Sequence, residues 1–140
     1  MIRRVLRSKI HRACVTAADT NYEGSISLSP ELLKAADIVP YEAVEVWNVT
    51  NGNRFQTYAI LGEAESLDIS INGAAAHLCS PGDIIIIACF GYYNSTEVLA
   101  ITPKVIFVDD KNRISGAGSE VPGPSSPGPS EIEKRKLCLV

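Results

Sequence analysis

Residues 43–60, AVEVWNVTNGNRFQTYAI, decide the fold class of the chain. Residues 43–49 are rich in β-branched side chains and include Trp47, the only tryptophan, which predicts a strand. Residues 50–53 contain an Asn-Gly pair, which readily takes the positive φ angles of a tight turn. Residues 54–60 then return as a second strand. The segment is therefore predicted to be a β-hairpin.

Further strand-like segments lie on both sides of this hairpin. Five of them have the composition or the alternation of strands: residues 1–6, 10–16, 67–71, 84–93 and 104–108. A second Asn-Gly pair, Asn72-Gly73, and the Pro-Gly-Asp sequence at 81–83 are predicted to be turns. This pattern predicts a mainly β domain.

One helix is predicted in front of the hairpin. Ser29 can cap it, Pro30 suits its first position, and Pro40 prevents it from continuing. Its buried side would consist of three apolar residues, Leu32, Leu33 and Ala36. A second short helix is predicted over residues 74–77. Many short strands with one or two short helices in a single domain predict a closed or nearly closed β-barrel.

The composition fits one globular domain and excludes some classes of function. The chain has 140 residues, 46% of them hydrophobic, which is enough to form a real core. Its formal net charge of −3 gives no general attraction to nucleic acid. The longest apolar run, residues 84–90, is too short to span a bilayer. Neither nucleic acid nor a membrane is therefore predicted as a partner.

The metal-binding residue types are scattered along the chain: Cys14, Cys79, Cys89 and Cys138, with His11 and His77. A zinc site needs ligands clustered at short spacing, so no metal is predicted. No secretory signal is evident, and the thiols are predicted to be reduced in the cytoplasm.

The two ends differ in composition from the middle. Residues 1–18 contain basic side chains and no acidic one, since Asp19 is the first acidic residue. Organelle transit peptides share this pattern, but a basic surface strand is the favoured interpretation. Residues 115–130 are mostly Gly, Ser and Pro, which bury little. We therefore predict a domain over residues 1–114 and a disordered tail over 115–140.

The motifs of common enzyme classes are absent, and Gly24-Ser25 is the remaining candidate. The sequence has no phosphate loop, no dinucleotide-binding turn and no serine-hydrolase elbow. Glycine permits a strained peptide, and the Ser25 hydroxyl can attack the carbonyl before it to form an ester. Elimination leaves dehydroalanine, which hydrolyses to a pyruvoyl group. This electrophilic ketone can form a Schiff base and withdraw electrons from a substrate carbon.

The dipeptide alone is not specific. Gly118-Ser119 repeats it, and its ordinary interpretation is a loop that enters a strand. The surrounding sequence helps to decide between a self-cleavage site and an ordinary loop, because several longer motifs accompany the dipeptide. These motifs are residues 9–12 (KIHR), 22–25 (YEGS), 47–52 (WNVTNG), 54–55 (RF), 57–60 (TYAI), 72–77 (NGAAAH), 82–84 (GDI) and 86–88 (IIA).

In order and spacing these motifs resemble the bacterial aspartate 1-decarboxylase family, pyruvoyl enzymes that make β-alanine for pantothenate biosynthesis. The resemblance runs from residue 1 to about residue 110. It implies a small double-psi β-barrel, assembled as a cytoplasmic homotetramer with active sites between subunits, and L-aspartate as substrate. One position departs from the pattern: the family often has His where this chain has Asn21.

The resemblance also implies the roles of the reacting residues. Ser25 would become the pyruvoyl group of residues 25–140 after self-cleavage behind Gly24, and Thr57 would hold the Gly24 carbonyl during cleavage. Tyr58, a protonated phenol, would donate the proton that replaces carbon dioxide. Arg54 would clamp a substrate carboxylate through its planar donor fork. Without the family context, each of these is an ordinary strand or turn residue.

Further residues would complete the substrate pocket. Lys9 would add a second positive charge for a dicarboxylic substrate. Small side chains and backbone donors would approach the substrate at four consecutive positions, Asn72, Gly73, Ala74 and Ala75. His11 and Trp47 would support the pocket without reacting.

Two other functions stay open at this point. A barrel that binds a ligand without turnover would not need a Gly-Ser scission site together with Thr57, Arg54 and Tyr58. A self-cleaving hydrolase is weaker, because no histidine or carboxylate pair that could activate water is evident.

Overall fold

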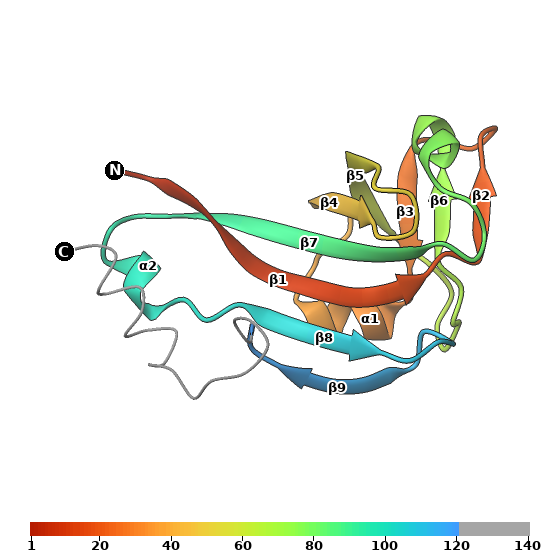
Figure 1. Ribbon diagram of the computed structural model, residues 1–140. Helices are drawn as coiled ribbons and strands as arrows, with labels where there is room; N and C mark the ends of the chain where they lie inside the picture. Colours follow the sequence, from red (N-terminus) through yellow and green to blue (C-terminus); the bar gives the residue numbers. More distant parts are fainter. Residues whose placement is uncertain (121–140) are drawn as a thin grey trace.

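The chain forms a mainly β structure built on one curled sheet (Figure 1). The computed structural model describes residues 1–120, and within them nine strands pair in the order β2-β6-β3-β5-β4-β7-β1-β8-β9. The elements are β1 Arg3–Cys14, β2 Ala17–Asp19, β3 Ser25–Leu28, α1 Pro30–Ala36, β4 Ala43–Asn48, β5 Arg54–Leu61, β6 Ser70–Asn72, the 3-10 helix η1 Gly73–Leu78, β7 Ile84–Tyr93, α2 Glu97–Ala100, β8 Lys104–Val108 and β9 Ile114–Gly118.

The predicted hairpin is confirmed and lies in the middle of the sheet. β4 and β5 pair antiparallel, with Ala43 opposite Tyr58 and Trp47 opposite Arg54. Gly52 in the connecting turn has a φ of 81°, as the Asn-Gly pair predicted. The other edge of β4 pairs with β7, so this hairpin joins the two halves of the sheet.

The sheet curls around a core of aliphatic side chains. β3, β6 and β2 run across the long strands β1 and β7, and α1 lies close to the middle of β1 and β8 (Figure 1). The completely buried side chains come from both regions and are mainly isoleucine: Ile10, Ile26, Ile69, Ile71, Ile85 and Ile87. Among residues 1–120 no strand pairing joins β2 to β9, so the barrel-like sheet is not closed by hydrogen bonds.

Helix α1 has the start and the buried face that were predicted. The Ser29 side chain accepts a hydrogen bond from the backbone N–H of Leu32, and Pro30 is the first helical residue. Leu32, Leu33 and Ala36 are buried. The helix ends when Asp37 takes the left-handed conformation, ahead of Pro40.

Several expected boundaries were wrong. The two strands expected over residues 1–6 and 10–16 are one strand, β1, whose pairing with β7 shifts register twice. The strand expected over 67–71 is shorter and begins at Ser70. Gly73 does not make a hairpin turn but starts η1, which confirms the second short helix. β2 and α2 were not predicted.

The sheet also extends further toward the C-terminus than predicted. Residues 115–118 belong to β9, which pairs antiparallel with β8 and places Gly118 opposite Val105. The Gly-rich composition concealed this strand, because backbone pairing needs no apolar side chain. The rest of the predicted tail, residues 121–140, lies outside the described residues. No helix within residues 1–120 is long and apolar enough to cross a membrane.

Candidate active site

Ser25 is the first residue of β3 and only 1% exposed. The chain is continuous from Gly24 to Ser25, so the geometry is that of the uncut peptide. The Ser25 hydroxyl donates a hydrogen bond to the carbonyl of Glu23 at 3.2 Å. It accepts another from the side-chain amide of Asn72 at 3.0 Å. The Ser25 hydroxyl, next to the Gly24–Ser25 peptide bond, is therefore shielded from water and held by two partners.

Asn72 organises the polar groups around this serine. Its amide nitrogen also donates to the Ser27 hydroxyl at 3.1 Å, and its carbonyl oxygen accepts from the Ser70 hydroxyl at 2.9 Å. Antiparallel pairing of β3 with β6 puts Asn72 directly opposite Ser25. Asn72 is 3% exposed, so these hydrogen bonds replace those that water would make.

Gly73 allows η1 to press against the backbone of Gly24. A Cβ on Gly73 would lie 2.6 Å from both the Cα and the nitrogen of Gly24, and 2.9 Å from the Tyr22 carbonyl oxygen. The φ angle of Gly73 is also positive, at 67°. Both the space and the backbone conformation require glycine at this position.

Thr57 and Tyr58 lie on β5, the other neighbour of β3. β3 and β5 are parallel, with Ile26 aligned with Ala59. Continuing this register aligns Ser25 with Tyr58 and Gly24 with Thr57. Since side chains alternate along a strand, Tyr58 faces the side of the sheet to which Ser25 belongs, and Thr57 faces the other side. Both predicted residues are thus on the strand next to β3, which begins at Ser25.

Arg54, at the start of β5, is stacked on an aromatic ring. Its guanidinium carbon lies 4.8 Å from the centre of the Trp47 ring. No ion pair is recorded between Arg54 and any acidic side chain of residues 1–120. Arg54 is exposed, and it shares the outer face of β5 with Tyr58. Its N–H donors are therefore available to a carboxylate from outside the chain.

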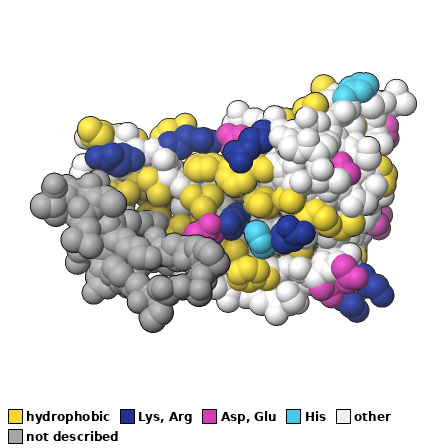
Figure 2. All heavy atoms as spheres, in the orientation of Figure 1, with side chains coloured by type: hydrophobic (Ala, Val, Ile, Leu, Met, Phe, Trp, Pro, Cys, Tyr) yellow, Lys and Arg dark blue, Asp and Glu magenta, His cyan; other side chains and the backbone are white. Residues whose placement is uncertain are grey.

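Lys9 lies apart from these residues. It is on β1, and β5, β4 and β7 separate that strand from β3. Its ammonium group pairs at 2.8 Å with Glu120, and both line a cavity of about 140 Å³ with His11 and Phe107. Figure 2 shows basic and histidine side chains together over this part of the sheet, among hydrophobic ones.

The surroundings of His11 in this cavity favour its neutral form. Burial lowers its pKa, and the positive charges of Lys9 and Arg12 lower it further, although Glu120 acts in the opposite direction. Its Nδ1 atom is buried and has no hydrogen-bond partner among the described residues. His11 packs edge-on against the Phe107 ring, with the ring centres 5.9 Å apart.

The predicted Ala positions follow directly from Gly73 in η1. Ala74 is exposed and Ala75 is partly buried against the core. The Ala75 side of η1 packs against the core, and the Ala74 side is exposed. Gly73, at the start of η1, lies against Gly24. Asn72 contacts Ser25, and Thr57 and Tyr58 are on the adjacent strand β5, whereas Lys9 is on β1.

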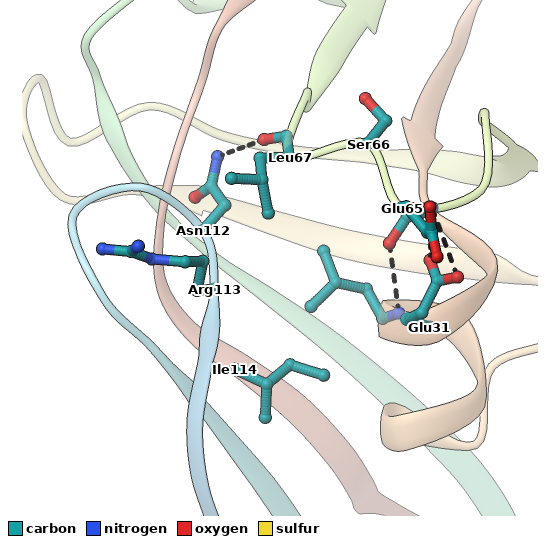
Figure 3. Close-up of a pocket in the computed structure, with 9 residues that line it drawn as sticks. Glu31, Glu65, Ser66, Leu67, Asn112, Arg113 and Ile114 are labelled. Atoms are coloured by element: carbon teal, nitrogen blue, oxygen red, sulfur yellow. Dashed lines mark hydrogen bonds between the residues drawn. The ribbon is translucent and has the colours of Figure 1, made fainter.

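A second cavity, of about 200 Å³, contains none of the predicted site residues. It lies between the start of α1, the segment before β6 and the turn between β8 and β9 (Figure 3). Asn112 closes one side, where its side-chain amide donates to the Leu67 carbonyl at 2.9 Å. Within residues 1–120 no group of three or more His, Cys, Asp or Glu side chains is placed to hold a metal ion.

Two features of the site were missed by sequence reasoning. Glu120 lies in the segment predicted to be disordered, so its ion pair with Lys9 was not expected. The stacking of Arg54 on Trp47 depends on the register of the hairpin. That register could have been estimated from the residues on each side of the Asn-Gly turn.

Comparison with known proteins gives a consistent result. The family model for aspartate decarboxylase matches residues 1–115. An aspartate 1-decarboxylase of Legionella pneumophila is 56% identical over 130 residues, which cover 88% of this chain and 98% of the relative. The aspartate 1-decarboxylase of Syntrophotalea carbinolica is 56% identical, and the match covers 90% of this chain and 96% of the relative. That of Rhodopirellula baltica is 52% identical, and the match covers 88% of this chain and 79% of the relative.

Proposed function

The chain belongs to the aspartate decarboxylase family, and on that premise we propose that it cuts itself between Gly24 and Ser25 and then converts L-aspartate to β-alanine and carbon dioxide. The observation that carries the proposal is the environment of Ser25. This hydroxyl is buried beside a glycine peptide and held by the Asn72 amide, within a family of decarboxylases.

Self-cleavage would proceed through Ser25 itself. Attack of its oxygen on the Gly24 carbonyl breaks the peptide C–N bond and forms an ester, with the proton passing from oxygen to nitrogen. Elimination then releases Gly24 as a carboxylate and leaves dehydroalanine at residue 25. Addition of water and loss of ammonia convert this residue to a pyruvoyl group.

Thr57 and Asn72 would assist this cleavage from the two neighbouring strands. The β3–β5 pairing begins at Ile26 and Ala59, and continuing it by two residues puts Thr57 level with Gly24, so its hydroxyl is a candidate donor to the oxygen of the attacked carbonyl. Asn72 holds the Ser25 oxygen at 3.0 Å and limits its rotation. The close contact of Gly73 with Gly24 fixes the backbone of the peptide that breaks.

The residues around Ser25 fit a terminal pyruvoyl group. The site is buried, and loss of the Ser25 hydroxyl oxygen on elimination would free the Asn72 amide N–H to donate to an oxygen of the pyruvoyl group or of its substrate. A pyruvoyl ketone supplies an electron sink for the loss of a carboxylate. Tyr58 lies on the adjacent strand and the same side of the sheet, so its hydroxyl would supply the proton to the substrate carbon.

Arg54 would select a substrate with an acidic side chain. Among the described residues its guanidinium has an aromatic neighbour and no recorded acidic partner, whereas Arg4, Arg7 and Arg113 are all ion-paired. A planar guanidinium binds a carboxylate through two parallel hydrogen bonds. The residues Ala74 and Ala75 would leave room for a small amino acid.

Lys9 would act in a site shared between subunits. Along the sheet Lys9 is four strands from Ser25, and within residues 1–120 its ammonium group pairs with Glu120 and not with any residue that contacts Ser25. A homotetramer with sites between subunits would bring Lys9 of one chain to Ser25 of another. We place this enzyme in the cytoplasm, where its β-alanine would supply pantothenate biosynthesis.

The direct test is incubation of the purified chain with L-aspartate, followed by measurement of β-alanine and carbon dioxide. We expect both products in equal amounts from the wild type and neither from Ser25→Ala. Binding of aspartate without either product would contradict the decarboxylase and support a ligand-binding module.

A further inference from the structure

Four neighbouring strands, β5, β4, β7 and β1, follow one another in the sheet (Figure 1). A stack of aromatic and cationic side chains crosses them, with one side chain from each strand. Arg54 lies over Trp47, with 4.8 Å from its guanidinium carbon to the ring centre. The Trp47 ring meets Phe90 at 60°, with the ring centres 6.4 Å apart. Arg4 covers the Phe90 ring at 4.1 Å. The stack therefore links the predicted substrate clamp to the other half of the sheet.

The two ends of this stack differ in their electrostatic partners. Arg4 forms an ion pair with Glu45 at 2.8 Å, and Glu45 lies on β4 two residues before Trp47. This pair holds the Arg4 guanidinium that lies over Phe90. At the other end, no ion pair is recorded between Arg54 and an acidic side chain within residues 1–120. The stack is thus anchored at Arg4 and open at Arg54.

The geometry points to Trp47 as a positioning residue for Arg54, an inference that rests on the proposed function. A guanidinium lying against an indole uses its face for the contact and keeps the N–H donors at its edge free. The ring restricts the rotamers of the long side chain before substrate arrives. Arg54 is thereby held ready to bind the side-chain carboxylate of aspartate, and Trp47 acts only through it.

Removal of the ring should weaken substrate binding without affecting the reacting groups. We expect Trp47→Leu to raise the KM for aspartate about 2- to 5-fold, the range given by a cation–π contact at an exposed site. The kcat should stay within about threefold, because Ser25 and Tyr58 lie on β3 and further along β5. Trp47→Phe retains an aromatic face and should recover most of the wild-type KM.

The kinetic test uses these two variants, Arg54→Lys, and the double variant Trp47→Leu/Arg54→Lys. A lysine ammonium lacks the planar stacking surface, so Trp47→Leu should change KM less than about twofold in that background. Tyr92→Leu is the matched control, since Tyr92 is an aromatic residue on β7 that is 72% exposed. The fraction of self-cleaved chain, measured by mass, checks that each variant folds.

A binding measurement separates this inference from the proposed function. Trp47 is the only tryptophan, so its fluorescence reports on this stack alone. Succinate, a dicarboxylate without an amine, should change the emission of the wild type and not that of Arg54→Lys. An unchanged wild-type emission, or equal KM values for Trp47→Leu and the wild type, would overturn the inference. Absence of β-alanine from the wild type would instead overturn the proposed function, and the succinate titration would still test Trp47.

Discussion

Gly73 controls how closely η1 approaches the peptide that is proposed to break. Because its Cβ would overlap the Gly24 backbone and its φ is 67°, Gly73→Ala must displace either η1 or Gly24. We expect a loss of about 1–3 kcal/mol in stability. Self-cleavage should slow at least about tenfold, because attack needs a fixed distance between hydroxyl and carbonyl. Urea unfolding and mass spectra taken over time would measure the two effects.

Gly52→Ala is the control for this substitution. Gly52 also has a positive φ, 81°, but an added Cβ would meet no atom within 4 Å. It should cost about 1–2 kcal/mol of stability and leave the rate of self-cleavage unchanged. Equal cleavage rates in the two variants would show that the contact between Gly73 and Gly24 is not needed.

Asn72 provides a second prediction at this scale. Asn72→Ala removes the amide that holds the Ser25 oxygen, and we expect self-cleavage to slow by about 10- to 1,000-fold. Ser27→Ala removes another partner of Asn72 and keeps the bond to Ser25, so it should stay within about threefold of the wild type. A fast-cleaving Asn72→Ala would contradict the role given to this amide.

At the scale of strands and helices, the sequence predicted those elements that depend on residues close together in the chain. The hairpin of β4 and β5 and the Ser29 cap of α1 each depend on adjacent residues, and both are confirmed. Asn72-Gly73 is the instructive exception, because the same dipeptide starts η1 where a turn was expected. β9 was missed because its stability depends on a partner strand, β8, and not on its own side chains.

A partly buried polar cluster joins β1, β7 and the segment before β4. Arg7 forms an ion pair with Glu42, and the Cys89 thiol donates a hydrogen bond to the Glu42 carboxylate at 3.1 Å. Burial and, next, the hydrogen bond to Glu42 raise the pKa of Cys89 to about 11. For Glu42, burial alone would raise the pKa, but hydrogen bonds from Val39 and Cys89 and the charge of Arg7 lower it below 4.5.

This cluster predicts how stability depends on pH. A carboxylate with a lowered folded pKa stabilises the protein fully above its unfolded value of about 4.5, and this contribution is lost as pH falls through the folded pKa. Glu42→Gln should therefore lower stability by about 1–2 kcal/mol at pH 7 and flatten the acid side of the stability curve. Urea unfolding of the wild type and Glu42→Gln at several pH values would measure this difference in stability. The exposed Glu63→Gln should keep the wild-type curve, and identical curves for all three proteins would contradict the prediction.

At the scale of the whole molecule, the predicted site divides into two parts. The resemblance to known decarboxylases supplied Ser25, Thr57, Tyr58 and Asn72, and the fold brings their strands together. Lys9 could not be placed from sequence, because its distance from Ser25 depends on the order of strands in the sheet. Its ion pair with Glu120 depends on β9, which composition did not reveal.

A shared site predicts complementation between inactive chains. Lys9→Ala and Ser25→Ala, expressed together with different tags and purified through both, should form mixed oligomers in which some sites have Lys9 from one chain and Ser25 from the other. Random assembly gives about a quarter of the wild-type sites. The production of β-alanine would be measured. Mixed oligomers no more active than either variant alone would place both residues of a site in one chain.

The most direct test of the central claim is the mass of the purified wild-type chain. The account predicts two fragments separated after Gly24, with residues 25–140 lighter by one ammonia than the same fragment beginning with serine. Ser25→Ala, treated in the same way, should stay whole. A wild-type chain that remains a single uncut species after prolonged warming, or with cell extract added, would contradict the account.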